Sequence, residues 1–143
     1  MCAASFKRLR YYDEACRFDL KEADMPGEAR GFNTPKETRQ FKAHGKIELV
    51  ELRGGLAGRG TFEPGWKWSQ DVKPIAGTDS CRAAHTGYVI SGRMHVAFDD
   101  GSAIDVGPGD VFHMPPGHDA WTVGDAACVM VDFSGVENYA KPS

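Results

Sequence analysis

The sequence predicts a single all-β domain, and three features indicate this. Short segments such as 46–52 and 93–98 alternate apolar and polar residues, which is the period of a half-buried strand. Turn residues such as Gly54-Gly55, Ser91-Gly92 and Asp99-Asp100-Gly101 separate these segments about every eight to twelve residues. No helical pattern alternates with the strands, so a parallel α/β sheet is not expected. The 143 residues suffice for one domain with a buried core.

The order of the elements follows from these alternating segments and the turns between them. We expect strands over residues 46–52, 56–63, 85–91, 93–98, 103–106, 111–114, 121–123 and 128–133. The stretch 66–84 contains Pro74 and Gly77 and is predicted to include a long loop. The predicted organisation is an amino-terminal arm over 1–38, with a short helix over 11–21 as one option, a β-barrel over 39–135 and a carboxy-terminal tail over 136–143.

Charge and composition exclude several classes of function. The formal net charge of -3 and a pI near 5.9 argue against a nucleic-acid surface, which needs a basic face. No apolar run is long enough for a membrane span, and the first residues lack the apolar core of a signal peptide. A cytoplasmic protein is therefore expected. The four cysteines show no CxxC spacing, so we expect free thiols in a reducing compartment.

The clearest motif begins at Gly109 and reads GDVFHMPPGHDAW. Gly109, Pro115 and Gly117 have the spacing of the second sequence block of the cupin superfamily, which this stretch resembles. Ala120 stands where the family has a histidine. The resemblance covers roughly residues 49–133 and implies a jelly-roll barrel, that is, an antiparallel double-stranded β-helix, with a pocket inside.

A second motif lies upstream and resembles the first cupin block. That block contains a glycine, a His-x-His pair, a glutamate and a second glycine. Gly65 and Gly92 match the two glycines. Asp71 and Lys73 stand in place of the two histidines, and His85 stands in place of the glutamate. Eleven residues separate Lys73 from His85, where the family has three or four.

The usual cupin site holds a divalent transition metal on three imidazoles and one carboxylate, and all four of those positions differ here. A rearranged centre is one alternative, because His118 lies two residues before Ala120 and faces the same side of a regular strand. Cys81 also lies four residues before His85. The other alternative is that His118 ends an exposed turn while Cys81 and His85 only pack. The predicted metal site, which suits zinc best, consists of His85, His118, Cys81 and Asp71.

Aromatic and cationic side chains complete the predicted pocket. Trp66 and Trp68 are two residues apart, which places them on one face of a strand, and Trp121 follows the Ala120 position. The three tryptophans predict either an aromatic wall for a small organic ligand or ordinary core. Lys73 would pair with an anionic substrate or act as a base, or it is a solvated charge in a loop.

Two functions of different class follow. The first is a small-molecule enzyme of the cupin type, an isomerase, cyclase, lyase or oxygenase for a modest polar substrate. In it His85, His118 and Lys73 are the catalytic residues, and a divalent metal is a cofactor in one version. The second is a non-catalytic cupin that binds a small metabolite in the same pocket. The expected partners are this ligand and a second copy of the chain in a homodimer, with no nucleic acid and no membrane.

Overall fold

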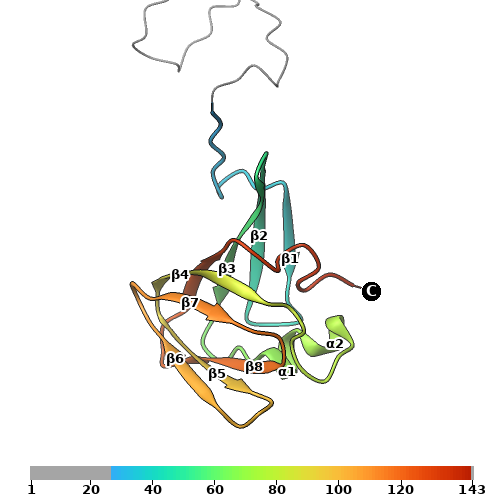
Figure 1. Cartoon of the computed structure of the whole chain (residues 1–143), viewed down its shortest axis with the longest axis vertical. Helices are drawn as coiled ribbons and strands as arrows, with labels where there is room; N and C mark the ends of the chain where they lie inside the picture. The colour runs from blue at the N-terminus through green and yellow to red at the C-terminus, as the bar shows by residue number, and fades with distance from the viewer. Residues whose placement is uncertain (1–26, 143) are drawn as a thin grey trace, which may run out of the picture.

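The computed structural model describes residues 27–142, which form two antiparallel β-sheets and two short helices. The sheets lie against each other as a barrel, and the β2–β3 hairpin extends beyond it (Figure 1). The helix considered for residues 11–21 lies outside the described residues. The first strand begins at Glu37, inside the segment predicted to be an arm.

The larger sheet has six strands in the order β1-β2-β3-β9-β4-β7. These strands are β1 (Glu37–Gln40), β2 (Gly45–Leu52), β3 (Gly55–Phe62), β9 (Cys128–Asp132), β4 (His85–Ser91) and β7 (Val111–Met114). The smaller sheet has the order β6-β5-β8 and consists of β6 (Ala103–Val106), β5 (Arg93–Phe98) and β8 (His118–Val123). All pairs of neighbouring strands are antiparallel. The all-β jelly-roll class predicted from the sequence is confirmed.

The segment predicted as a loop before β4 contains two single-turn helices, α1 (Trp68–Asp71) and α2 (Lys73–Ala76). Pro74 lies in the first turn of α2, where its missing N–H costs nothing, and Gly77 ends the helix with a positive φ of 73°. Because Trp68 begins α1, the prediction that Trp66 and Trp68 share one face of a strand was wrong. Within residues 27–142, no helix is long and apolar enough to cross a membrane.

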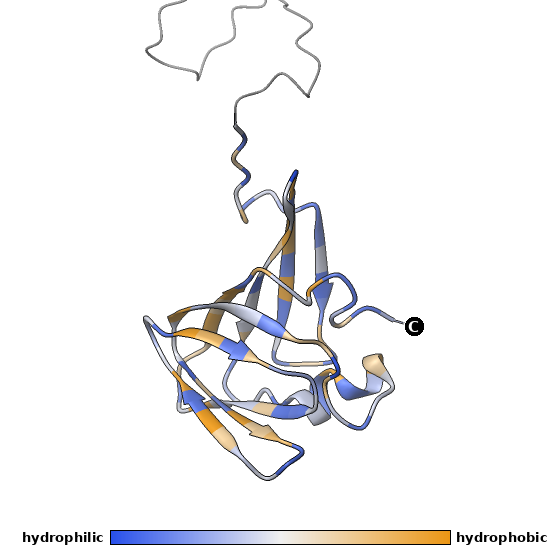
Figure 2. Cartoon of the chain, in the orientation of Figure 1, coloured by the Kyte–Doolittle hydropathy of each residue, from blue (hydrophilic) through white to orange (hydrophobic). Residues whose placement is uncertain are grey.

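The core fills the space between the two sheets. Every second residue of β8 and β9 is buried, and the same alternation runs through the first five residues of β4. In Figure 2 apolar and polar residues are interspersed along the strands, most clearly along β2. Side chains from both sheets meet inside, among them Val89, Met94, Val96, Phe112, Met114, Ala120, Cys128 and Met130. This interior also contains the buried side chains of Cys81, His85 and His118.

The carboxy-terminal segment, residues 133–142, folds back onto the barrel instead of leaving it. Val136, Tyr139 and Ala140 are buried members of the core. Arg39 of β1 holds the segment, because its guanidinium donates hydrogen bonds to the carbonyl oxygens of Val136 and Tyr139 at 2.9 and 2.7 Å. Gly135 makes the turn with a φ of 74°, where a side chain would overlap the Ala84 carbonyl. The segment therefore reaches the barrel interior through Tyr139.

Candidate metal centre

Three buried side chains meet in the barrel interior: Cys81, His85 and His118. One potential ligand atom from each lies within 4.8 Å of the others. His85 begins β4 and His118 begins β8, so the two imidazoles come from different sheets. The sulfur of Cys81 lies 3.5 Å from Nε2 of His85. This group could hold a metal ion.

Backbone pairing fixes Cys81 beside His118. The two residues form an isolated antiparallel bridge, in which the amide of Cys81 donates to the carbonyl of His118 at 2.8 Å. The amide of Gly117 returns a bond to the Cys81 carbonyl at 2.7 Å. The loop after α2 is thus tied to the start of β8. This short bridge places Cys81, which belongs to an irregular segment, beside the first residue of β8.

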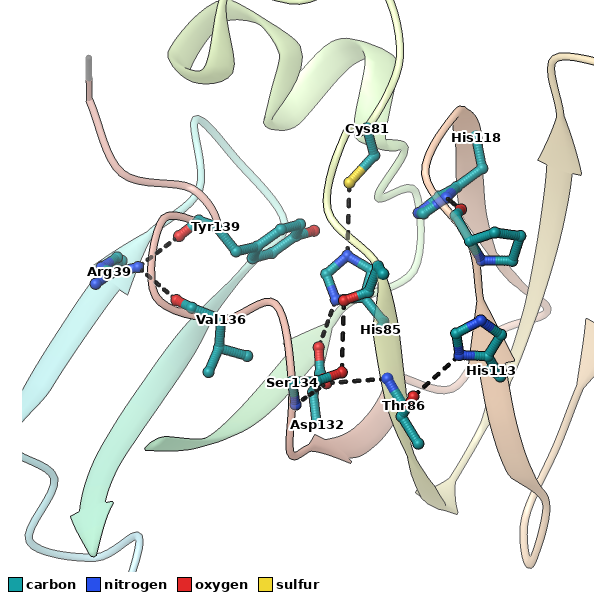
Figure 3. Close-up of polar contacts among 12 residues, drawn as sticks. Arg39, Cys81, His85, Thr86, His113, His118, Asp132, Ser134, Val136 and Tyr139 are labelled. Carbon is teal, nitrogen blue, oxygen red and sulfur yellow. Dashed lines mark hydrogen bonds and ion pairs between the residues drawn. The ribbon is translucent and has the colours of Figure 1, made fainter. Parts of the chain in front are cut away.

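Hydrogen bonds set the tautomer of both imidazoles. Nδ1 of His118 lies 2.8 Å from the carbonyl oxygen of Pro115, which can only accept, so Nδ1 carries the proton. Nδ1 of His85 likewise bonds the carboxylate of Asp132 (Figure 3). In each neutral ring the free lone pair is then on Nε2. Carboxylate and carbonyl partners of this kind orient metal-binding histidines in proteins.

Asp132 is itself held in place. One of its carboxylate oxygens accepts backbone N–H bonds from Thr86 at 3.3 Å and from Ser134 at 2.9 Å. The other oxygen bonds His85. Asp132 ends β9 and its backbone pairs with Gly87 of β4, so the carboxylate and the imidazole come from adjacent strands. The orientation of His85 is therefore determined by the sheet.

The site favours the charged forms of its thiol and its imidazole. Burial alone would raise the pKa of Cys81, but hydrogen bonds from His118 and His85 and their charge lower it to about 6. Burial would lower the pKa of His85, yet the bonds and charges of Asp132 and Cys81 raise it to about 9. At neutral pH the metal-free site therefore holds a thiolate beside an imidazolium. A thiolate is also the form in which cysteine coordinates a metal.

Tyr139 covers this group from the carboxy-terminal segment. Its ring packs edge-on against His85 with centroids 5.2 Å apart, and it points toward Cys81 and His85 (Figure 3). Burial and the nearby charges of Cys81 and Asp132 raise the pKa of the phenol well above 10. Tyr139 therefore keeps its proton and can donate a hydrogen bond into the site.

Two cavities adjoin the group. The inner cavity, lined by His85 and His118, has a volume of about 40 Å³. It has room for no more than about three water molecules. A larger outer chamber of about 710 Å³ lies under the carboxy-terminal segment and is lined by Cys81. Trp68 and Tyr139 line both cavities.

The structure does not bring two further predicted site residues to this group. The carboxylate of Asp71 is buried elsewhere, 3.1 Å from Nδ1 of His44 and 3.1 Å from the amide of Lys67. Lys73 begins α2, and its ammonium lies 3.8 Å from the exposed carboxylate of Asp79. Both positions precede the irregular segment that separates them from β4. Asp71 thus stabilises the start of α1, and Lys73 carries a solvated charge.

The three predicted wall tryptophans occupy three different environments. Trp66 packs in the aromatic core against Phe62, with ring centroids 4.5 Å apart. Trp121 lies outside the barrel, where its ring packs in a tilted arrangement on His95 with centroids 4.6 Å apart. It points outward because it alternates with the buried residues of β8. Trp68 alone lines the cavities near the cysteine and the two histidines.

Asp132 and Tyr139 are site residues that sequence reasoning missed. Asp132 carried a usable signal, since a carboxylate that ends an apolar strand must find a partner when it is buried. Tyr139 carried none, because no periodic pattern surrounds it. Its place depends on the hydrogen bond to Arg39, a hundred residues away in sequence.

Comparison with known proteins agrees with an antiparallel jelly-roll barrel. Residues 79–134 match the cupin domain family, which supports a cupin-superfamily domain in this part of the chain. The match spans β4 to β9 and includes Cys81, His85 and His118. The predicted resemblance to the cupin superfamily is confirmed, and the match includes the second sequence block but not Gly65, Asp71 or Lys73 of the first. No curated protein sequence matches the chain.

Solved structures with the same fold include an RmlC-like cupin from Shewanella frigidimarina, with 22% identity and a TM-score of 0.50. The match covers 78% of this chain and 94% of that one. The polyketide cyclase RemF from Streptomyces resistomycificus is 16% identical with a TM-score of 0.54, over 78% of this chain and 80% of that one. At these identities the likeness establishes the fold alone.

Proposed function

We propose that the protein is a zinc-dependent small-molecule enzyme of the cupin type, with Cys81, His85 and His118 as the metal ligands. The observation that carries this proposal is that both imidazoles have Nδ1 committed to an oxygen acceptor, while the thiol lies within 4.8 Å of both rings. Three protein donors are typical of catalytic zinc sites, whereas structural sites have four.

The donor atoms suit zinc in kind and in spacing. With bonds of about 2.3 Å to sulfur and about 2.0–2.1 Å to nitrogen, a tetrahedral ion separates the two donors by roughly 3.5 Å. The sulfur of Cys81 and Nε2 of His85 are 3.5 Å apart. Sulfur and imidazole nitrogen are also the donors that zinc prefers over magnesium or calcium. The residues therefore fit the ion without rearrangement of the pair.

The surrounding residues support catalysis on a substrate oxygen. A bound zinc ion would supply a Lewis acid that polarises such an oxygen. Asp132 holds His85 in one orientation, and Tyr139 offers a proton donor beside it. Apolar side chains of the inner cavity, such as Met114 and Met130, exclude bulk water. This arrangement favours an isomerase, cyclase or lyase over a reaction that needs iron in a histidine-rich centre.

Elemental analysis of protein purified without an affinity tag tests the proposal. We expect close to one equivalent of zinc in the wild type and in His95→Ala, whose ring lies outside the barrel. His85→Ala is expected to lose the metal. Metal-free wild type that takes up no zinc on titration, or full zinc content in a folded His85→Ala, would overturn the proposal.

A non-catalytic metabolite-binding cupin is the second candidate. The outer chamber of about 710 Å³ favours it, because it can hold a small organic molecule, whereas the inner cavity of about 40 Å³ beside the histidines cannot. Product analysis by mass spectrometry separates the two functions. A ligand that raises the melting temperature and is recovered unchanged from zinc-loaded protein would identify a binder.

The homodimer and the cytoplasmic location remain predictions. Exposed apolar side chains on adjacent strands support the dimer, since Tyr88 of β4 pairs with Val111 of β7 and both side chains are exposed. The mass in solution by light scattering tests it, with Val111→Asp expected to yield monomer. Two free thiols, Cys81 and Cys128, support a reducing compartment.

A further inference from the structure

The outer chamber provides the space that the inner cavity lacks. Its volume is about 710 Å³ against about 40 Å³ inside the barrel. Apolar side chains from three parts of the fold form much of its wall, namely Leu56, Val72, Ala76, Ala83 and Val136. Cys81 borders it, so an occupant lies next to the group that we propose as the metal site. Its size and lining suit a small organic molecule.

Trp68 provides the first sign of what such a molecule carries. The side chain is 2% exposed, and its indole N–H has no hydrogen-bond partner among residues 27–142. Buried donors are almost always paired, so an unpaired one beside a cavity points to an acceptor on a ligand. An indole nitrogen only donates. The missing partner must therefore be an acceptor atom.

Tyr139 is the second residue shared by the two cavities, and its hydroxyl can also donate. Two donors on residues that line both cavities favour a ligand acceptor with two lone pairs, such as an oxygen, over a ligand nitrogen with one. A carbonyl oxygen meets this requirement and still leaves the rest of the molecule apolar. Such an oxygen would be held at the boundary between the chamber and the histidines.

We propose that the outer chamber binds a small, largely apolar carbonyl compound, whose oxygen accepts hydrogen bonds from the indole of Trp68 and the hydroxyl of Tyr139. The proposal rests on the proposed function in that it names the substrate class for the same site. Paired donors on a carbonyl oxygen also stabilise negative charge that develops there, which suits isomerases, cyclases and lyases.

Cyclohexanone and methylenecyclohexane are a matched pair of probes, because the second replaces the carbonyl oxygen by a CH₂ group of similar shape. Indole N–H signals in a nitrogen–proton correlation spectrum report on the tryptophans separately, and Trp68→Phe assigns the signal of interest. We expect cyclohexanone to shift the Trp68 signal and methylenecyclohexane to leave it nearly unchanged. Equal shifts with both probes, or no shift with either, would overturn the proposal.

Three variants locate the donors. Trp68→Phe and Tyr139→Phe should each bind cyclohexanone about three- to tenfold more weakly, since each loses one hydrogen bond. Trp66→Phe is the control, because Trp66 also has a buried, unpaired indole N–H but does not line either cavity. Its affinity should equal that of the wild type. Unchanged affinity in both folded test variants, or the same loss in Trp66→Phe, contradicts the assignment.

The zinc content of the same samples separates this inference from the proposed function. A ketone-specific shift of the Trp68 signal in protein that takes up no zinc would support carbonyl binding in the outer chamber and refute the proposed metal site. Full zinc content without such a shift would refute carbonyl binding in the outer chamber and leave the proposed metal site unaffected. The two outcomes are independent, because Trp68 and Tyr139 are not zinc ligands in the proposed centre.

Discussion

The carboxylate of Asp132 accepts the Nδ1 hydrogen of His85 between two adjacent strands of the larger sheet. A second Asp–His pair of the same chemistry, Asp105 and His95, lies on the surface with the atoms 2.7 Å apart. The buried pair is fixed by the sheet and faces the thiol, whereas the exposed pair faces solvent. The surface pair therefore serves as an internal control for the roles assigned to the buried one.

Asp132→Asn is expected to weaken zinc binding by about 10- to 100-fold. The carboxylate fixes the imidazole of His85 and raises its basicity, and an amide does neither as well. Competition against a chromophoric chelator measures the change. Asp105→Asn should bind zinc as the wild type does. Equal affinities in Asp132→Asn and the wild type would contradict the orienting role of Asp132.

The stabilisation from the Asp132–His85 pair depends on pH in the metal-free protein. The pKa of His85 is raised from 6.5 to about 9, so the stabilisation is fully present below about pH 6.5 and is lost as the pH rises through about 9. The stabilisation from the Cys81 thiolate depends on pH in the opposite direction. The pKa of Cys81 is lowered to about 6, so its contribution to stability is lost as the pH falls through that value.

Cys81→Ser is therefore the right background in which to measure the pair. We expect Asp132→Asn in that background to lower the unfolding free energy by on the order of 1–3 kcal/mol below pH 6.5. The difference should shrink toward zero as the pH rises through the pKa of His85, which lies below about 9 in this background because the contribution of Cys81 is absent. Urea denaturation across this range measures it, and a difference that grows with pH would show that the sign is wrong.

Alkylation should distinguish the two cysteines whose surroundings the structure describes. Cys81 borders the outer chamber and has a pKa of about 6, whereas burial raises the pKa of Cys128 to about 12. Iodoacetamide at pH 7.5 is expected to modify Cys81 and spare Cys128 in the metal-free protein, because the thiolate is the nucleophile. Peptide mapping by mass spectrometry reads the result. Zinc should protect Cys81, and failure to do so argues against sulfur ligation.

Arg39→Met should release the carboxy-terminal segment. The substitution removes the guanidinium that donates to the carbonyls of Val136 and Tyr139, at an expected cost of about 2–4 kcal/mol in unfolding free energy. Amide exchange over residues 136–140 should become faster. Arg59→Met, which breaks an ion pair with Glu48 instead, is the control. Unchanged exchange in Arg39→Met would mean that the segment is held by packing alone.

The alternation of inward- and outward-facing residues along β-strands made part of the site predictable. A two-residue step returns to the same face, so His118 could be placed inside the barrel from the position of Ala120. The same rule places Trp121 outside the barrel, which is inconsistent with the prediction that Trp121 belongs to an aromatic wall of the pocket. Strands 85–91, 93–98, 103–106 and 111–114 were predicted at the observed bounds, because glycine and proline turns delimit them.

The rest depended on contacts that no local pattern records. The helices α1 and α2 have four residues each, which is too short for a helical period to show. Asp71 and Lys73 lie in these helices, so their alignment with the histidines of the first cupin block did not carry over to the site. The partnership of Asp132 with His85 and the position of Tyr139 arise from strand pairing and from Arg39.

Absorption spectroscopy of the cobalt(II) form tests the central claim most directly, because it reports the ligand atoms themselves. With Cys81, His85 and His118 as ligands, we expect intense visible bands of a four-coordinate ion and a thiolate-to-cobalt charge-transfer band in the near ultraviolet. Cys81→Ser should abolish the charge-transfer band, and His95→Ala should retain both features. A weak spectrum of six-coordinate type that Cys81→Ser leaves unchanged would contradict the metal centre proposed for this barrel.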